Sequence, residues 1–185
     1  MRAKNVSQMM AWLEQEHPQW VTFFALAVFA GVRPDRDDGE MRKLANAIRE
    51  HGMQPYIRAG TLYISAAIAK DGRARTVPLS KNLRAWLAQY PVTPESLLAG
   101  DREEYAMIRA KWMIPHDGLR HTSMSACATL HGIAEAVKRH GNSEKVSLDH
   151  YISLFTPREA KAFYAILPRP AAKVEPKTEA PGQAA

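Results

Sequence analysis

The stretch TLYISAAIAKDGRARTVPLS, from Thr61 to Ser80, decides the fold class because the hydrophobic pattern changes within it. Two of its segments, TLYISAAI and ARTVPLS, have the composition of strands. The Asp71-Gly72 pair between them is typical of a hairpin turn. The preceding segment QPYIRAG is a candidate third strand. We therefore predict a small antiparallel sheet in this part of the chain.

Helical patterns lie on both sides of the predicted sheet. The run VTFFALAVFAGV (Val21–Val32) is apolar but too short to span a bilayer, so it predicts a buried helix, which Pro18 opens. In GEMRKLANAIREHG, apolar residues recur at helical spacing and Gly52 is typical of a C-terminal cap. Further helices are predicted at about 7–15, 80–90, 101–112, 118–130, 132–140, 143–154 and 157–166. The predicted fold class is mainly α with a small antiparallel β-sheet, an α+β arrangement.

Length and composition indicate one globular domain. The 185 residues are 46% hydrophobic, enough for a real core, and we assign residues 1–167 to this domain. Residues 168–185, PRPAAKVEPKTEAPGQAA, are expected to form a disordered Pro/Ala-rich tail. The single cysteine, Cys127, excludes a disulfide framework and a cysteine-based metal site.

Charge narrows the class of partner. The net charge of +6 favours a polyanionic partner. Glu14 and Glu16 stand where a signal peptide would be apolar, so we expect a cytoplasmic protein that does not act at a membrane.

Several residues that could carry chemistry also have an ordinary structural interpretation. Arg33, directly after the apolar helix, could be a solvated cation at a helix C-terminus. Lys70 could be a surface lysine beside a turn, Arg120 an ion-pair partner, and Tyr151 a half-buried aromatic residue. Taken singly, none of these residues indicates a function.

The stretch PHDGLRHT (Pro115–Thr122) also allows two interpretations. In one, Asp117 is the N-cap of a helix and accepts its backbone N–H groups. In the other, the segment is an anion site where an arginine and helix N–H groups converge on a phosphate.

Order and spacing favour the second interpretation. The chain presents, in sequence, AVFAGVRP, IAKDGRARTVPLS, LRHT, HGNSE and HYISL. These five elements resemble the catalytic domain of tyrosine recombinases, the phage-integrase family, whose motifs include an arginine in G-[LIV]-R-P, a hairpin lysine before R-x-V-P-L, H-x-L-R-H-T and L-G-H-S. The resemblance covers about residues 20–166. It implies the fold of that domain and site-specific recombination by cutting and rejoining DNA strands.

The resemblance assigns roles to the candidate residues. Tyr151 would attack the phosphodiester and form a 3′-phosphotyrosine intermediate. Arg33 and Arg120 would clamp the non-bridging oxygens of the transition state. Lys70 would protonate the departing 5′-oxygen. The family needs neither a metal ion nor a cofactor, acts on double-stranded DNA and self-associates on it as a recombinase tetramer.

The match departs from the family pattern around the second arginine. The family histidine lies three residues before this arginine, where the chain has Asp117; His116 is one residue earlier. We expect His116 to take the histidine's place and Asp117 to cap the helix, with Gly118 absorbing the shift. Asn142 stands where the family has a histidine or tryptophan, and His140 lies two residues before it. Asn142 keeps an N–H donor but cannot exchange a proton.

A third departure is an insertion of four residues, 35–38, between the R-P pair and Glu40. Glu40 would then be the structural partner that orients an active-site arginine. The resemblance also implies a separate N-terminal DNA-binding domain, so the chain is either a fragment or a stand-alone catalytic half. Other functions stay open: a catalytically decayed DNA-binding relic, a type IB topoisomerase, and a helical protein-interaction module.

Overall fold

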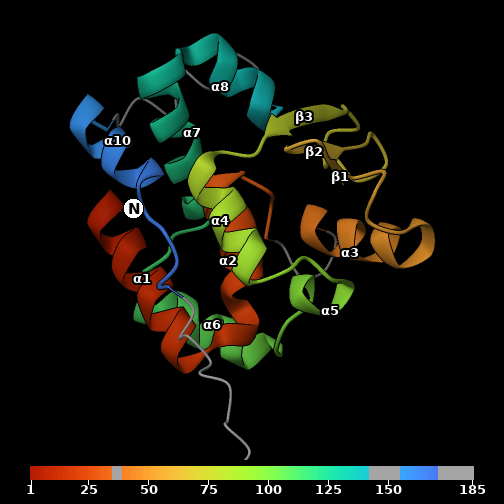
Figure 1. The fold of residues 1–185 in the computed structure, drawn as a ribbon, viewed down its shortest axis with the longest axis horizontal. Helices are drawn as coiled ribbons and strands as arrows, with labels where there is room; N and C mark the ends of the chain where they lie inside the picture. Colours follow the sequence, from red (N-terminus) through yellow and green to blue (C-terminus); the bar gives the residue numbers. More distant parts are fainter. Residues whose placement is uncertain (35–38, 142–154, 171–185) are drawn as a thin grey trace, which may run out of the picture.

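The computed structural model describes residues 1–34, 39–141 and 155–170. Helices come first in the chain, a short sheet follows, and helices close it (Figure 1). Before the sheet lie α1 (Ala3–Glu16), the 3-10 helix η1 (Pro18–Trp20), α2 (Val21–Phe29) and α3 (Glu40–His51). After the sheet lie α4 (Lys81–Gln89), α5 (Pro94–Leu97), α6 (Arg102–Lys111), α7 (Gly118–His131), α8 (Ile133–His140) and α10 (Pro157–Tyr164).

The helix α2 forms the centre of the core. Every residue from Val21 to Phe29 is buried, as its uninterrupted apolar sequence predicts. It packs against α1, α4, α5 and α7, and Figure 1 shows it in the middle of the helices. Burying one large apolar side chain such as Phe24 stabilises a fold by about 1.5–3 kcal/mol. This helix therefore provides the rigid base from which Arg33 emerges.

The sheet has three antiparallel strands in the order β1 (Ile57–Arg58), β2 (Thr61–Ile64) and β3 (Arg75–Pro78). Leu62 pairs with Val77, and both side chains are buried, whereas Tyr63 faces solvent. This alternation is the one expected of a sheet that covers a core on one face. The predicted class, mainly helical with a small antiparallel sheet, is confirmed, including the candidate third strand.

The connection between β2 and β3 differs from the prediction. We expected a hairpin turn at Asp71-Gly72, but ten residues separate Ile64 from Arg75 and form successive turns. The N–H groups of Ile68 and Ala69 both donate to the Ser65 carbonyl. Ile68 and Ala69 are both buried, which a strand with alternating faces does not allow for consecutive residues. The connection is therefore long enough to carry Lys70 away from the sheet.

The predicted helices are otherwise found, with shifted ends. The first begins at Ala3 rather than Ser7, and the short helix α5 was missed. The sequence around α5 has a capping box, in which the side chains of Thr93 and Ser96 each bond the other's backbone N–H. The helix predicted at 143–154 and the tail from residue 171 lie outside the described residues. None of the described helices combines the length and hydrophobicity needed to cross a bilayer.

Candidate functional site

Four of the predicted site residues line one cavity of about 460 Å³: Arg33, Lys70, His116 and Asp117. They come from three separate segments, namely the chain after α2, the connection between β2 and β3, and the loop before α7. Residues of α6 complete the lining. The described residues around the cavity are Arg33, Pro34, Gly39, Lys70, Arg102, Tyr105, Arg109, Ile114, Pro115, His116, Asp117, Gly118 and Leu119.

Arg33 reaches the cavity because the chain turns sharply at Gly31. This glycine has a φ of +65°, and a Cβ there would lie 2.4 Å from the ring of His140. Only glycine fits both requirements without strain. The turn directs the half-buried Arg33 side chain toward the start of α7, where its Nη1 donates to Oδ2 of Asp117 at 3.0 Å. This pair brings a cation and a carboxylate to the same wall of the cavity.

The expectation that Asp117 caps α7 with its side chain is wrong. Asp117 occupies the N-cap position, but its carboxylate makes no capping bond and binds Arg33 instead. The left-handed conformation in this segment falls on Asp117, with a φ of 57°, and not on Gly118, where we expected the backbone freedom. Aspartate tolerates this region better than most residues. A Cβ at Gly118 would lie 2.6 Å from Cδ of Pro115, so this glycine provides space rather than flexibility.

Glu40, the first residue of α3, joins the segments beneath the cavity. Its buried carboxylate binds the Arg75 guanidinium through two bonds of 2.7 and 2.6 Å. It also accepts the backbone N–H of Arg33 at 3.0 Å and that of Lys70 at 3.4 Å. Burial acts to raise the pKa of Glu40, but the hydrogen bonds and charge of Arg75 outweigh it and hold the pKa below its ordinary value. Glu40 thus fixes the backbone of two of the cavity cations, Arg33 and Lys70.

Glu40 orients Arg33 mainly through the main chain. Its carboxylate lies 4.0 Å from Nε of Arg33, much farther than from the nitrogens of Arg75. Arg75 was not among the predicted site residues. The strand pattern contained a signal for it, because Arg75 has the same phase as the inward-facing Val77 and a buried arginine requires an acidic partner.

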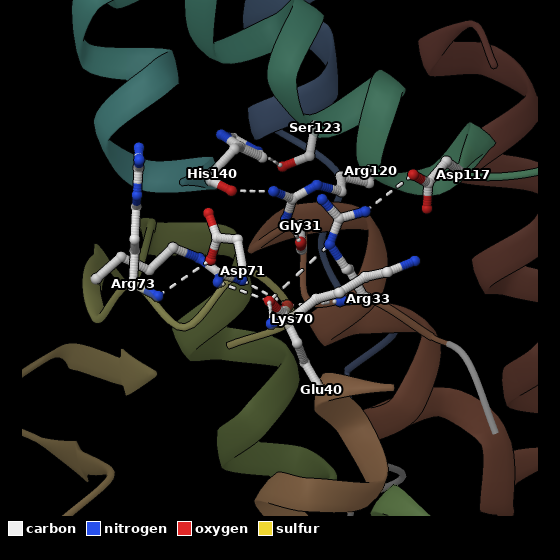
Figure 2. Close-up of polar contacts among 11 residues, drawn as sticks. Gly31, Arg33, Glu40, Lys70, Asp71, Arg73, Asp117, Arg120, Ser123 and His140 are labelled. Atoms are coloured by element: carbon white, nitrogen blue, oxygen red, sulfur yellow. Dashed lines mark hydrogen bonds and ion pairs between the residues drawn. The ribbon is translucent and has the colours of Figure 1, made fainter. Parts of the chain in front are cut away.

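Arg120 lies behind the cavity rather than in its lining. It is 1% exposed, and its guanidinium donates to the carbonyl of Gly31 at 2.6 Å and to that of His140. Figure 2 shows these bonds joining α7 both to the end of α8 and to the turn before Arg33. Arg120 therefore holds the backbone turn that presents Arg33.

His140 is a buried member of the same network. Its Nδ1 lies 2.8 Å from the Ala136 carbonyl, which can only accept, so Nδ1 carries the proton. Its Nε2, 3.0 Å from Oγ of Ser123, then accepts from that hydroxyl (Figure 2). Burial, together with the charge of Arg120, lowers the pKa of His140 to about 3. The ring is therefore neutral at neutral pH.

The other predicted residues fall into two groups. Lys70 and His116 are exposed at the cavity, where each can reach a bound molecule. Asn142 and Tyr151 lie outside the described residues. Sequence reasoning missed Arg102, Tyr105 and Arg109 of α6, which share the cavity with Arg33. These residues belong to no motif, because the sequence of α6 shows only the pattern of an amphipathic helix.

The side chains that line the cavity are suited to binding an anion. Four cationic side chains, those of Arg33, Lys70, Arg102 and Arg109, line it together with the carboxylate of Asp117. Within residues 1–34, 39–141 and 155–170, no three His, Cys, Asp or Glu side chains are grouped to hold a metal ion.

The chain matches no protein-family model, no curated protein and no solved structure.

Proposed function

We propose that this chain cuts and rejoins DNA strands as a tyrosine recombinase does, through a covalent 3′-phosphotyrosine intermediate on Tyr151. One observation supports the proposal above all others. Arg33, Lys70 and His116, which the recombinase resemblance selects from distant parts of the sequence, line the same cavity. Residues that merely matched a motif by chance would have no reason to meet in space.

A DNA phosphodiester suits the charge of this cavity. The guanidinium of Arg33 can donate to non-bridging oxygens, and its backbone is fixed by Glu40 and by the Gly31 turn. Such preorganised donors stabilise the charge of a five-coordinate transition state without reorganising during the reaction.

In the proposed reaction one residue accepts a proton and another donates one. The phenolic oxygen of Tyr151 bonds to phosphorus, His116 accepts the phenolic proton, and the bond to the 5′-oxygen breaks. Lys70 then donates a proton to that oxygen, which leaves as a hydroxyl. Both Lys70 and His116 are exposed at the cavity, as proton transfer to a bound strand requires.

A trapping experiment tests the proposal. A pool of 5′-labelled duplexes of random sequence, each carrying a nick that lets the cleaved end diffuse away, is incubated with the protein and separated under denaturing conditions. We expect labelled DNA to migrate with the protein, and the Tyr151→Phe variant to form no such adduct. Tyr63→Phe is the matched control, since Tyr63 is exposed on β2. An adduct in Tyr151→Phe at the rate of the unaltered protein would refute the assignment.

One observation favours a second candidate, a DNA-binding protein without cleavage activity. The guanidinium of Arg120 is buried and occupied by two carbonyl groups. Because this side chain is buried and is not among the described residues that line the cavity, a phosphate could reach it only if the site rearranged. DNA binding without any adduct in the trapping experiment would support this candidate. Relaxation of supercoiled DNA would instead favour type IB topoisomerase activity.

A further inference from the structure

The α6 side of the cavity carries cations that the proposed reaction does not use. Arg102, in the first turn of α6, and Arg109, in its last, line the cavity together with Tyr105. Neither arginine belongs to the recombinase motifs. Cationic side chains therefore line this cavity on the α6 side as well as at Arg33 and Lys70.

Arg109 is held in place on a rigid support. Its Nη2 donates to the Ile114 carbonyl at 3.1 Å, and its guanidinium lies 5.8 Å from the centre of the Tyr105 ring. Tyr105 stacks in turn on the buried Trp20, with ring centres 5.7 Å apart. A guanidinium fixed in this way loses little conformational entropy when it binds an anion.

The two glutamates in the first turn of α6, Glu103 and Glu104, are not among the described residues that line the cavity. Among the described lining residues the only carboxylate is Asp117, which is paired with Arg33. Glu104 of α6 is bound to His17 and Gln19, at 2.7 and 2.8 Å. Arg102 and Arg109 therefore line a part of the cavity whose one described carboxylate is bound to another cation.

A DNA strand presents further anions beside the phosphate that is cleaved. Each strand of a duplex carries one phosphate per 3.4 Å of helix axis. A strand with one phosphate at Arg33 and Lys70 therefore brings its neighbouring phosphates past the adjoining wall.

We propose that Arg102 and Arg109 form a second phosphate subsite, which binds the DNA backbone next to the phosphodiester that is cleaved. This inference rests on the proposed function for the identity of the ligand. The subsite fixes the register of the strand in the cavity and carries no base specificity, since it contacts phosphate alone.

Salt-dependent binding tests the subsite. The affinity of the protein for a fluorescent DNA duplex is measured by anisotropy at several salt concentrations. Loss of one phosphate contact reduces the slope of log affinity against log salt by about 0.9. We expect this reduction in Arg102→Gln and in Arg109→Gln. Arg158→Gln, an exposed position on α10 away from the cavity lining, should keep the slope of the unaltered protein.

Folding defects are separated by a second variant. Arg109→Gln and Arg109→Lys both remove the guanidinium bond to Ile114. Only Arg109→Lys keeps the positive charge. If the subsite is real, Arg109→Lys restores the slope. Slopes equal to that of the unaltered protein in Arg102→Gln and Arg109→Gln, or no binding of the duplex by the unaltered protein even at low salt, would overturn the subsite.

The trapping experiment keeps this inference distinct from the proposed function. If the unaltered protein forms the covalent adduct but the glutamine variants keep their salt slopes, the subsite is wrong and the proposed function stands. If the slopes fall as expected but no adduct forms, the subsite stands and the cleavage activity is wrong.

Discussion

Arg33 and Asp117 lie 84 residues apart in the chain, and their side chains form an ion pair of 3.0 Å at the cavity. The carboxylate thus occupies a donor that the proposed function assigns to a phosphate oxygen. The side chains of Arg33 and Asp117 are 20% and 25% exposed, so solvent and ligands can reach the pair. A DNA strand entering the cavity must compete with Asp117 for the guanidinium.

This competition predicts tighter DNA binding when the charge of Asp117 is removed. Asp117→Asn keeps the size of the side chain and its tolerance of the left-handed backbone, but it no longer attracts the guanidinium strongly. We expect the affinity for a duplex to rise by roughly threefold to tenfold, equivalent to about 0.7–1.4 kcal/mol. Fluorescence anisotropy at fixed salt measures this change.

The control for this prediction is Glu50→Gln. It removes the same charge from the exposed end of α3 and should change the affinity much less. An Asp117→Asn protein that binds DNA no more tightly than Glu50→Gln would show that Asp117 does not compete with the ligand. Thermal melts should show only a small loss of stability, because Asp117 makes no capping bond and partly exposed ion pairs contribute little.

The buried pair of Glu40 and Arg75 predicts a large loss of stability in Glu40→Gln. This change leaves the Arg75 guanidinium buried without a compensating charge, which costs about 3–5 kcal/mol. It also weakens the acceptor that fixes the backbone of Arg33 and Lys70. Chemical unfolding measures the loss, with Glu50→Gln as the exposed control. A loss below about 1 kcal/mol would mean that the pair does not hold the site together.

The fold was predictable where local sequence determined local structure. The apolar run of α2 and the amphipathic pattern of α3 gave the correct element type because burial follows directly from the spacing of apolar residues. The turn between β2 and β3 was predicted incorrectly because Asp71-Gly72 is a strong local signal for a turn. This local signal does not show where strand β2 ends, so it gave no indication that the buried Ile68 and Ala69 lie outside the sheet.

The site was predictable for residues within motifs and less so for their partners. The motifs led to Arg33, Lys70 and His116, which line one cavity. The bond of Asp117 to Arg33 depends on how α7 meets the end of α2, which no local pattern encodes. The same reason explains why the cations of α6 were missed.

The buried histidine predicts how stability depends on pH. The pKa of His140 is lowered to about 3 in the folded protein, from an ordinary value of 6.5. The unfolded chain therefore binds one more proton between these values, and stability falls as the pH drops below 6.5. The limiting slope from this group is about 1.4 kcal/mol per pH unit.

Substitution of this histidine isolates its contribution. His140→Gln has no titrating group, so its stability should fall less steeply between pH 6 and 5 than that of the unaltered protein. Glu40 contributes mainly at lower pH, because its pKa lies below its ordinary value of 4.5 and its stabilisation is lost only as the pH falls through that lowered value. Parallel curves for the two proteins, measured by chemical unfolding, would show that His140 is not the group responsible.

The position of Lys70 predicts a substrate-dependent loss of activity. Glu40 fixes its backbone N–H, and its exposed side chain lines the cavity, where a departing 5′-oxygen would need a proton. On normal DNA, Lys70→Ala should slow adduct formation by roughly 10²–10⁴-fold, the usual contribution of a general acid. On a substrate with a 5′-thio leaving group the loss should be much smaller, because a thiolate leaves without protonation. Single-turnover cleavage of both substrates measures the difference.

Lys43→Ala, on α3, serves as the control, since Lys43 is not among the described residues that line the cavity. Equal losses on the two substrates would rule out proton donation by Lys70 and leave it the role of binding phosphate.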